Sequence, residues 1–144
     1  MNDWLLLVYK IPREPSAPRV QVWRKLKQLG ALLLQDAVWV LPAKPRTREQ
    51  FQWLAAEINE LGGEAAVWQS RLLPPAESQA IVARFQEQTA APHEEILAAL
   101  ASKSPDLAAL SRRFQQVQAS DYFPSDLSRK TRAALLAATT RNDV

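Results

Sequence analysis

Residues 4–12 read WLLLVYKIP, an almost unbroken run of apolar, aromatic and β-branched side chains that ends at a proline. A short run of this composition is typical of a buried β-strand. Two further extended runs follow, at residues 31–42 (ALLLQDAVWVLP) and residues 64–73 (EAAVWQSRLL). The polar pair Gln35–Asp36 interrupts residues 31–42, which therefore predict either two short strands around a tight bend or one strongly bent strand.

Two amphipathic helices are predicted between these strands. The first follows Pro18 and ends at Gly30. Its expected buried face is formed by Val22, Trp23, Leu26 and Leu29. The second helix occupies residues 47–63 (TREQFQWLAAEINELGG), with Thr47 as the expected N-cap and Gln50 as its capping-box partner.

The order strand, helix, two strands, helix, strand predicts an α+β fold. It is the order of a ferredoxin-like βαββαβ sandwich, in which both helices cover one face of an antiparallel sheet. We assign this domain to residues 1–75, and we expect its other sheet face to need a cover.

Residues 76–144 contain no convincing strand and predict a helical extension that packs on the sheet or on a dimer partner. The helices are expected to break at Pro92, at Ser104–Pro105 and around Phe123–Pro124. Ser104 is the expected N-cap of the helix that follows it, and Ser125 or Asp126 that of the last helix.

Two tryptophans do not fit a simple two-layer sandwich. Trp53 lies about 200° around its helix from Phe51, so it should point away from the sheet. Trp68 alternates with Val67, so one of the two should face the uncovered side of the sheet. We expect the C-terminal helices or a dimer partner to cover both indole rings, with ligand stacking as the alternative.

The composition argues against an enzyme. The chain has no cysteine, one histidine and three glycines, which removes thiol chemistry, multi-histidine metal sites and glycine-rich phosphate loops. His93 is expected to be a partly exposed residue near a helix start. The pairs Glu57/Glu60 and Glu94/Glu95 are expected on solvated helix faces, so no catalytic residue, metal or cofactor is predicted.

The composition also predicts the environment of the chain. With 47% hydrophobic and 23% charged residues, it is typical of a globular domain. It has no apolar run of about 18 residues and no basic segment before its first apolar stretch. We therefore expect a cytoplasmic protein without a membrane span.

The positive charge is concentrated at the N-terminus. The net charge is +3, and residues 1–30 hold six basic residues against two acidic ones. A basic cluster can neutralise phosphates or hold a small oxyanion, although a solvated helix face has the same composition. Arg129, Lys130 and Arg132 near the last helix start form a rival basic surface.

Several blocks of the sequence belong together in one known pattern: WLLLVYKIP, PSAPRVQVWRKLKQLGA, LLLQDAVWVLP, TREQFQWLAAEINELGGEAAVW and SDYFPSD. From about Trp4 to Phe123 they resemble the N-terminal domain of ChrB, a family of bacterial chromate-resistance regulators. The resemblance implies a cytoplasmic regulator that binds the operator DNA of a chromate-efflux operon and releases it when chromate accumulates. Chromate would be the effector, and a homodimer is expected.

The resemblance also implies which residues bind. Basic residues of this domain would serve DNA binding and chromate response, without a fixed division between the two. The matching positions are Lys10, Arg13, Arg19, Arg24, Lys25, Lys27, Arg46 and Arg48.

Two other functions stay open. Trp53, Trp68 and the alanine-rich helices are also typical of a non-enzymatic dimerisation or protein-interaction module that lacks its own sensing domain. The fold further resembles small CRISPR-associated ferredoxin-like nucleases, which place an aspartate at the end of the first strand. Lys10 stands there in this chain, and an ammonium group repels Mg²⁺, so a metal-dependent nuclease is not expected.

Overall fold

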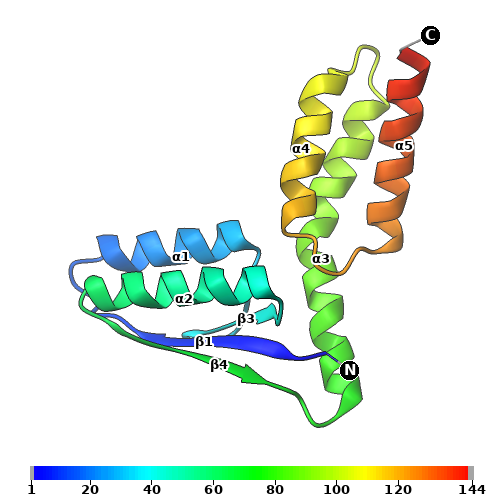
Figure 1. Ribbon diagram of the computed structural model, residues 1–144. Helices are drawn as coiled ribbons and strands as arrows, with labels where there is room; N and C mark the ends of the chain where they lie inside the picture. Colours follow the sequence, from blue (N-terminus) through cyan, green and yellow to red (C-terminus); the bar gives the residue numbers. More distant parts are fainter. Residues whose placement is uncertain (1, 143–144) are drawn as a thin grey trace. The chain divides into compact units, whose positions relative to one another are not determined.

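The protein is described by a computed structural model that covers residues 2–142 (Figure 1). It forms two compact units, Met1–Ala80 and Ile81–Val144, and the division falls within one long helix. The elements in order are β1 (Trp4–Lys10), α1 (Ala17–Leu29), β2 (Leu32–Gln35), β3 (Val38–Pro42), α2 (Pro45–Glu60), β4 (Glu64–Ser70), α3 (Pro75–Leu100), α4 (Leu107–Ala119) and α5 (Asp126–Asn142).

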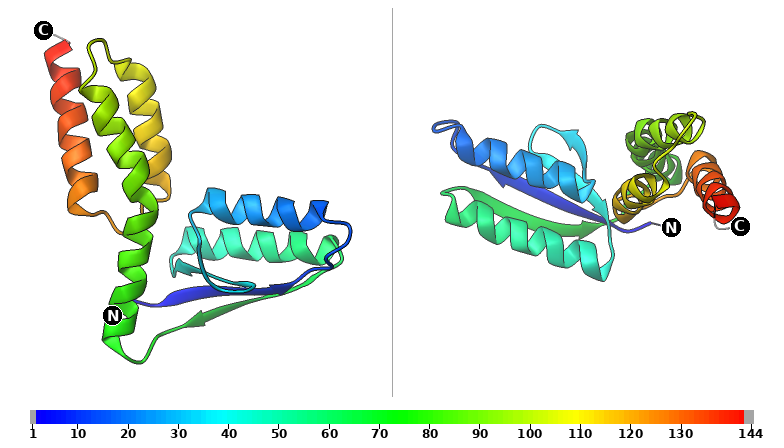
Figure 2. Two further views of the ribbon diagram at one scale, coloured as in Figure 1. Left: turned by 180° about the vertical axis from the view of Figure 1, so that it is seen from behind. Right: turned by 90° about the horizontal axis from the view of Figure 1, so that it is seen from above.

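The first unit contains a four-stranded sheet with the order β2-β3-β1-β4, and every neighbouring pair is antiparallel. Helices α1 and α2 lie side by side over one face of this sheet (Figures 1 and 2). The predicted α+β class is confirmed. Residues 31–42 form two strands, and the bend between them holds Asp36 at a φ of 39°.

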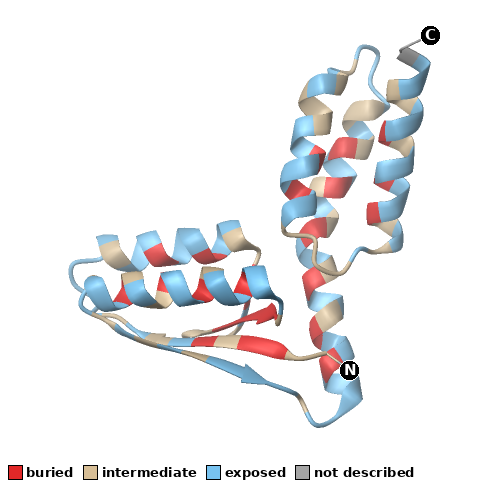
Figure 3. Ribbon diagram, viewed as in Figure 1, coloured by how far each residue is buried: buried red, intermediate tan, exposed pale blue. Residues whose placement is uncertain are grey.

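The core of the first unit lies between the sheet and these two helices. Leu5 and Leu7 of β1 pair with Leu41 and Trp39 of β3, so their side chains share one sheet face. The helices contribute Val22, Leu26, Phe51, Leu54 and Ile58, all buried (Figure 3). Each such side chain contributes roughly 1.5–3 kcal/mol relative to an exposed one.

The opposite sheet face is covered unevenly. Trp4 is buried there, and its Nε1 donates a hydrogen bond to the Ser78 hydroxyl in the first turns of α3 (3.1 Å). Farther along, Val8 and Trp68 are exposed. Trp68 is therefore the residue of β4 that faces away from α1 and α2, as alternation in the strand predicts.

The start of α2 differs from the prediction. The N-cap is Lys44, and Pro45 occupies the first turn, because its fixed φ suits that position. Thr47 lies inside the helix, where its hydroxyl accepts a hydrogen bond from the Lys44 backbone N–H (3.0 Å) and donates to the Pro42 carbonyl (2.5 Å).

Two predicted helix boundaries in residues 76–144 are wrong. Helix α3 continues through Pro92, although proline has no N–H group to donate to the preceding turn. Buried residues of α3 before and after Pro92 stabilise the helical conformation by packing. Helix α4 begins at Leu107, and its N-cap is Asp106 instead of Ser104. The Asp106 carboxylate accepts a hydrogen bond from Ala109 N–H (3.1 Å).

The second unit consists of helices packed around an apolar cluster. Ile96, Phe114, Val117 and Leu135 form its buried centre, with Leu100 and Leu110 against them. Ser125 precedes α5 as predicted, and its hydroxyl accepts a hydrogen bond from Ser128 N–H (3.1 Å). Within residues 2–142, no helix has both the length and the apolar character needed to cross a membrane.

His93 is fully buried inside α3, so the expectation of a partly exposed residue near a helix start is wrong. Its Nε2 donates a hydrogen bond to Asp121 Oδ2 (3.1 Å), which also accepts one from the Ser128 hydroxyl (2.8 Å). Asp121 therefore connects α3 to the start of α5. The sequence places these residues 28 and 7 positions apart, which no local pattern reveals.

Gly63 is required where α2 meets β1. A Cβ at this position would lie 2.5 Å from the Lys10 carbonyl oxygen and 2.9 Å from Ile58 Cγ2. We expect Gly63→Ala to lower the free energy of unfolding by about 1–3 kcal/mol, because the backbone must move to relieve the clash. Urea denaturation measures this change. Gly62→Asn is the control, since a Cβ at Gly62 meets nothing within 4 Å and asparagine tolerates its left-handed backbone; an equal loss in both variants would contradict the clash.

Asp121→Ala should destabilise the second unit by about 2–4 kcal/mol, because it leaves the buried His93 and Ser128 donors without their acceptor. Thermal unfolding followed by circular dichroism reports this loss. The matched control is Asp126→Ala, whose fully exposed carboxylate pairs with Arg129 and should contribute little to stability. A similar decrease of the melting temperature in both variants would show that the buried hydrogen bonds of Asp121 add no more stability than an exposed ion pair.

Candidate nucleic-acid interface

Helix α1 carries four of the eight basic residues predicted to bind DNA or an oxyanion. They are Arg19, Arg24, Lys25 and Lys27. All four side chains are exposed, but their surroundings differ. These surroundings decide which of them can bind a ligand.

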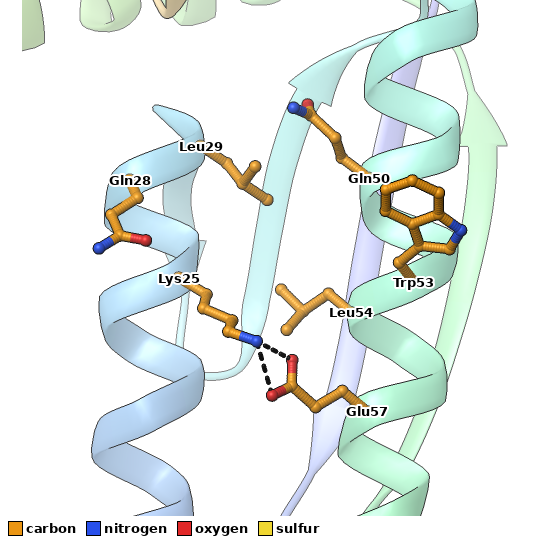
Figure 4. A pocket seen from close by; sticks show the side chains of 7 residues that line it. All are labelled: Lys25, Gln28, Leu29, Gln50, Trp53, Leu54 and Glu57. Atoms are coloured by element: carbon orange, nitrogen blue, oxygen red, sulfur yellow. Dashed lines mark hydrogen bonds and ion pairs between the residues drawn. The ribbon is translucent and has the colours of Figure 1, made fainter. Parts of the chain in front are cut away.

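Lys25 is turned toward α2. Its Nζ lies 2.6 and 2.7 Å from the two carboxylate oxygens of Glu57 (Figure 4). Gln21 Nε2 also donates a hydrogen bond to Glu57 (2.6 Å). The Lys25 hydrogen bond, followed by that of Gln21, lowers the pKa of the Glu57 carboxyl below its ordinary value, against the opposing effect of burial. Glu57 thus neutralises Lys25 and is not the freely solvated residue that the sequence predicts.

Lys27 lies against aromatic rings. Its Nζ is 5.5 Å from the centroid of the Trp23 ring and 6.0 Å from that of Trp39. Both contacts are within the range of cation–π attraction. The Lys27 ammonium group is therefore held close to the helix surface.

Arg19 and Arg24 have no ion pair or side-chain hydrogen bond with any other residue in the range 2–142. Both line a hollow of about 480 Å³ beside the N-terminal half of α1. The hollow is completed by Tyr9, Ser16, Val20 and Trp23. We call Ser16, Arg19, Val20, Trp23, Arg24 and Lys27 the outer face of α1.

The remaining four predicted residues do not join this surface as one cluster. Lys10 is the last residue of β1, and Arg13 follows the strand. The Lys10 carbonyl lies beside Gly63, just after α2. Arg46 lies in the first turn of α2, which is about 24 Å long. Arg48 donates to the Gln69 side chain of β4 (2.6 Å). Arg46 and Arg48 thus belong to α2, and Arg48 contacts β4 instead of joining the outer face of α1.

The rival basic surface on α5 is partly neutralised. Arg129 pairs with Asp126 and also donates to the Pro124 carbonyl (3.2 Å). Lys130 and Arg132 are exposed. Helix α1 is therefore the stronger candidate, because it presents two guanidinium groups without a partner among residues 2–142, beside an aromatic ring and a hollow.

Trp23 is the site residue that the sequence misassigned. It is 48% exposed, whereas the periodicity placed it on the buried face with Val22 and Leu26. Successive residues of a helix point about 100° apart, so Trp23 cannot share the centre of the buried face with Val22. This angle is the sequence signal for the exposure of Trp23. Val20, at 44% exposure, belongs to the same surface and was not singled out.

The Lys25–Glu57 pair predicts a pH-dependent stability. Because the folded-state pKa of Glu57 is lowered, its stabilising effect is complete above the ordinary glutamate pKa of 4.5 and is lost as the pH falls through the lowered value. Glu57→Gln should cost about 0.5–1 kcal/mol at pH 7 and much less at pH 3. Urea denaturation of wild type and variant at both pH values measures this. The control is Glu60→Gln, an exposed position on the same helix; a pH-independent cost of Glu57→Gln would refute the assignment.

The comparisons with known proteins agree on one family. The family described as Protein ChrB, N-terminal, matches residues 19–109. Protein ChrB of Cupriavidus metallidurans is 40% identical to the chain over 65 residues, which are 45% of this chain and 19% of that protein. The chain thus spans about a fifth of the length of this curated relative. No solved structure matches the chain. Because the family match covers more than half of the residues, the chain belongs to the family of the ChrB N-terminal domain.

Proposed function

We propose that this chain is the DNA-contacting part of a transcriptional regulator that controls chromate resistance and is not an enzyme. The family membership supports the regulator, and the unpaired Arg19 and Arg24 on α1 support the contact with DNA. This pair of guanidinium groups is the observation that carries the proposal.

The first unit is proposed to follow the ferredoxin-like plan. In that plan two βαβ halves interleave, so that β1 and β3 occupy the centre of the sheet and both helices cover one face. The strand order β2-β3-β1-β4 and the position of α1 and α2 support this assignment (Figure 2). The plan puts α1 on the surface, with its basic side chains available.

The proposed mechanism is electrostatic. Arg19 and Arg24 contact phosphate oxygens of operator DNA, and binding releases condensed counterions. A homodimer in the cytoplasm presents the α1 surface twice, as a regulator with two half-sites needs. Lys25 contributes little, because Glu57 already neutralises its charge.

Chromate is the proposed effector. It is a divalent tetrahedral oxyanion, and guanidinium groups bind such anions through charge-assisted hydrogen bonds. Chromate would compete with DNA phosphates for Arg19 and Arg24, or bind better to a dimer state that cannot bind DNA. Lys10, Arg13 and Arg46 are exposed and could add to either contact.

A protein-interaction module is the second candidate. It is favoured by the exposure of two large rings on different surfaces, Trp53 at 68% and Trp68 at 60%. Exposed tryptophans are frequent in protein interfaces. This function predicts no affinity for promoter DNA.

Fluorescence anisotropy with a labelled duplex from the promoter of the chain's own operon tests the DNA contact. We expect Arg19→Ala and Arg24→Ala each to weaken binding about 3- to 10-fold and to reduce the slope of log affinity against log salt by about 1. The matched control is Arg112→Ala, an exposed arginine of α4, which should leave both quantities unchanged.

The same titration tests the effector. Chromate is expected to release the duplex, whereas equimolar sulfate should not. Release by both anions would indicate simple ionic competition. Salt-insensitive binding, or unchanged binding by both arginine variants, would overturn the proposed contact, and no binding at all would favour the interaction module.

A further inference from the structure

Two exposed indole rings lie on opposite sides of the basic helix. Trp23 of α1 is 48% exposed and Trp53 of α2 is 68% exposed. Each ring leaves a flat apolar face open to a partner. Contacts with phosphates engage at most the indole N–H group and leave the ring faces unused.

Three adjoining hollows with shared lining residues lie between the two rings, and we call them together the trough. It begins in the hollow along the outer face of α1 and continues into a neighbouring one, which shares Val20 and Arg24 with it. The second hollow shares Lys25 and Gln28 with a groove of about 300 Å³ between α1 and α2. That groove ends at Trp53.

The groove between the helices has polar ends and an apolar floor. In Figure 4, Gln50 lies at one end and the Lys25–Glu57 pair at the other, with Leu29 and Leu54 between them. The Oε1 atom of Gln50 is buried and accepts no hydrogen bond from any described residue. A buried acceptor without a donor costs free energy, and rotation of the half-buried Gln50 amide into the groove would let a ligand N–H group recover it.

The charge of the trough favours an anionic partner. Arg19 and Arg24 are unpaired within the described residues, and the acidic Glu57 is neutralised by Lys25 and Gln21. Flat rings, free guanidinium groups and an unused amide together match the parts of a nucleotide. These parts are the base faces, the phosphates and the base edges with their amino groups.

We propose that this trough binds a short unpaired stretch of a nucleic-acid strand. Its bases stack on Trp23 and Trp53, its phosphates contact Arg19 and Arg24, and Gln50 accepts a hydrogen bond from a base amino group. A continuous duplex cannot provide these contacts, because its base faces are already stacked on each other. The inference rests on the proposed contact between α1 and DNA, and it adds the form in which the DNA is bound.

The test compares a labelled single strand and a duplex of the same length, titrated with the full chain. Trp53→Ala is expected to weaken single-strand binding about tenfold, the usual loss for one stacked base, and to change duplex binding little. Trp53→Phe keeps an aromatic face and should retain most of the affinity. The matched control is Trp68→Ala, which removes an equally exposed indole from the opposite sheet face and should have no effect.

The outcomes separate this inference from the proposed function. Salt-dependent duplex binding without measurable single-strand binding would overturn the inference and leave the regulator intact. The inference also fails if Trp53→Ala leaves single-strand affinity unchanged, or if Trp68→Ala lowers it equally. Loss of affinity that Trp53→Phe restores, together with quenching of tryptophan emission on binding, supports the stacking contact. Arginine variants that bind duplex normally would overturn the α1 phosphate contact.

Discussion

Burial of β1 is the constraint on which the rest of the first unit depends. This strand pairs with both β3 and β4, so it fixes the register of the sheet. Leu5 and Leu7 are fully covered on the helix side, while Trp4 is buried on the other. Helices α1 and α2 cover the first face, and α1 is thereby held with Val22 and Leu26 buried and its basic side chains exposed. The basic surface is a consequence of how the core is closed.

Pairing of charges then selects among the basic residues of α1. A lysine beside a carboxylate has little attraction left for phosphate, whereas an unpaired guanidinium keeps its charge and all its donors. Glu57 thus makes Lys25 a structural residue, whereas Arg19 and Arg24 keep their charge available for an anion. Because Glu57 comes from the neighbouring helix, the fold makes this distinction and local sequence does not.

The elements of the first unit were largely predictable, whereas the second unit was less so. A nearly continuous apolar run that ends at a proline located β1, and helical spacing located α2, because each signal is local. Pro92 misled the prediction of α3, since burial of His93 and Ile96 keeps that helix intact against the intrinsic preference of proline. The polar cluster of His93, Asp121 and Ser128 could not be predicted from the sequence either, because its members come together only when the helices pack.

By itself, the sequence determined the α+β class, the order of the first six elements, the basic character of the N-terminal third and the resemblance to its family. These properties follow from short-range periodicity, composition and recognisable blocks of residues. Tertiary structure alone decided that Lys25 is neutralised, that Arg19 and Arg24 pair with no residue in the described part of the chain, and that Trp23 lies at the surface. The physical reason is that pairing and exposure depend on neighbours from other elements, whose positions no local pattern encodes.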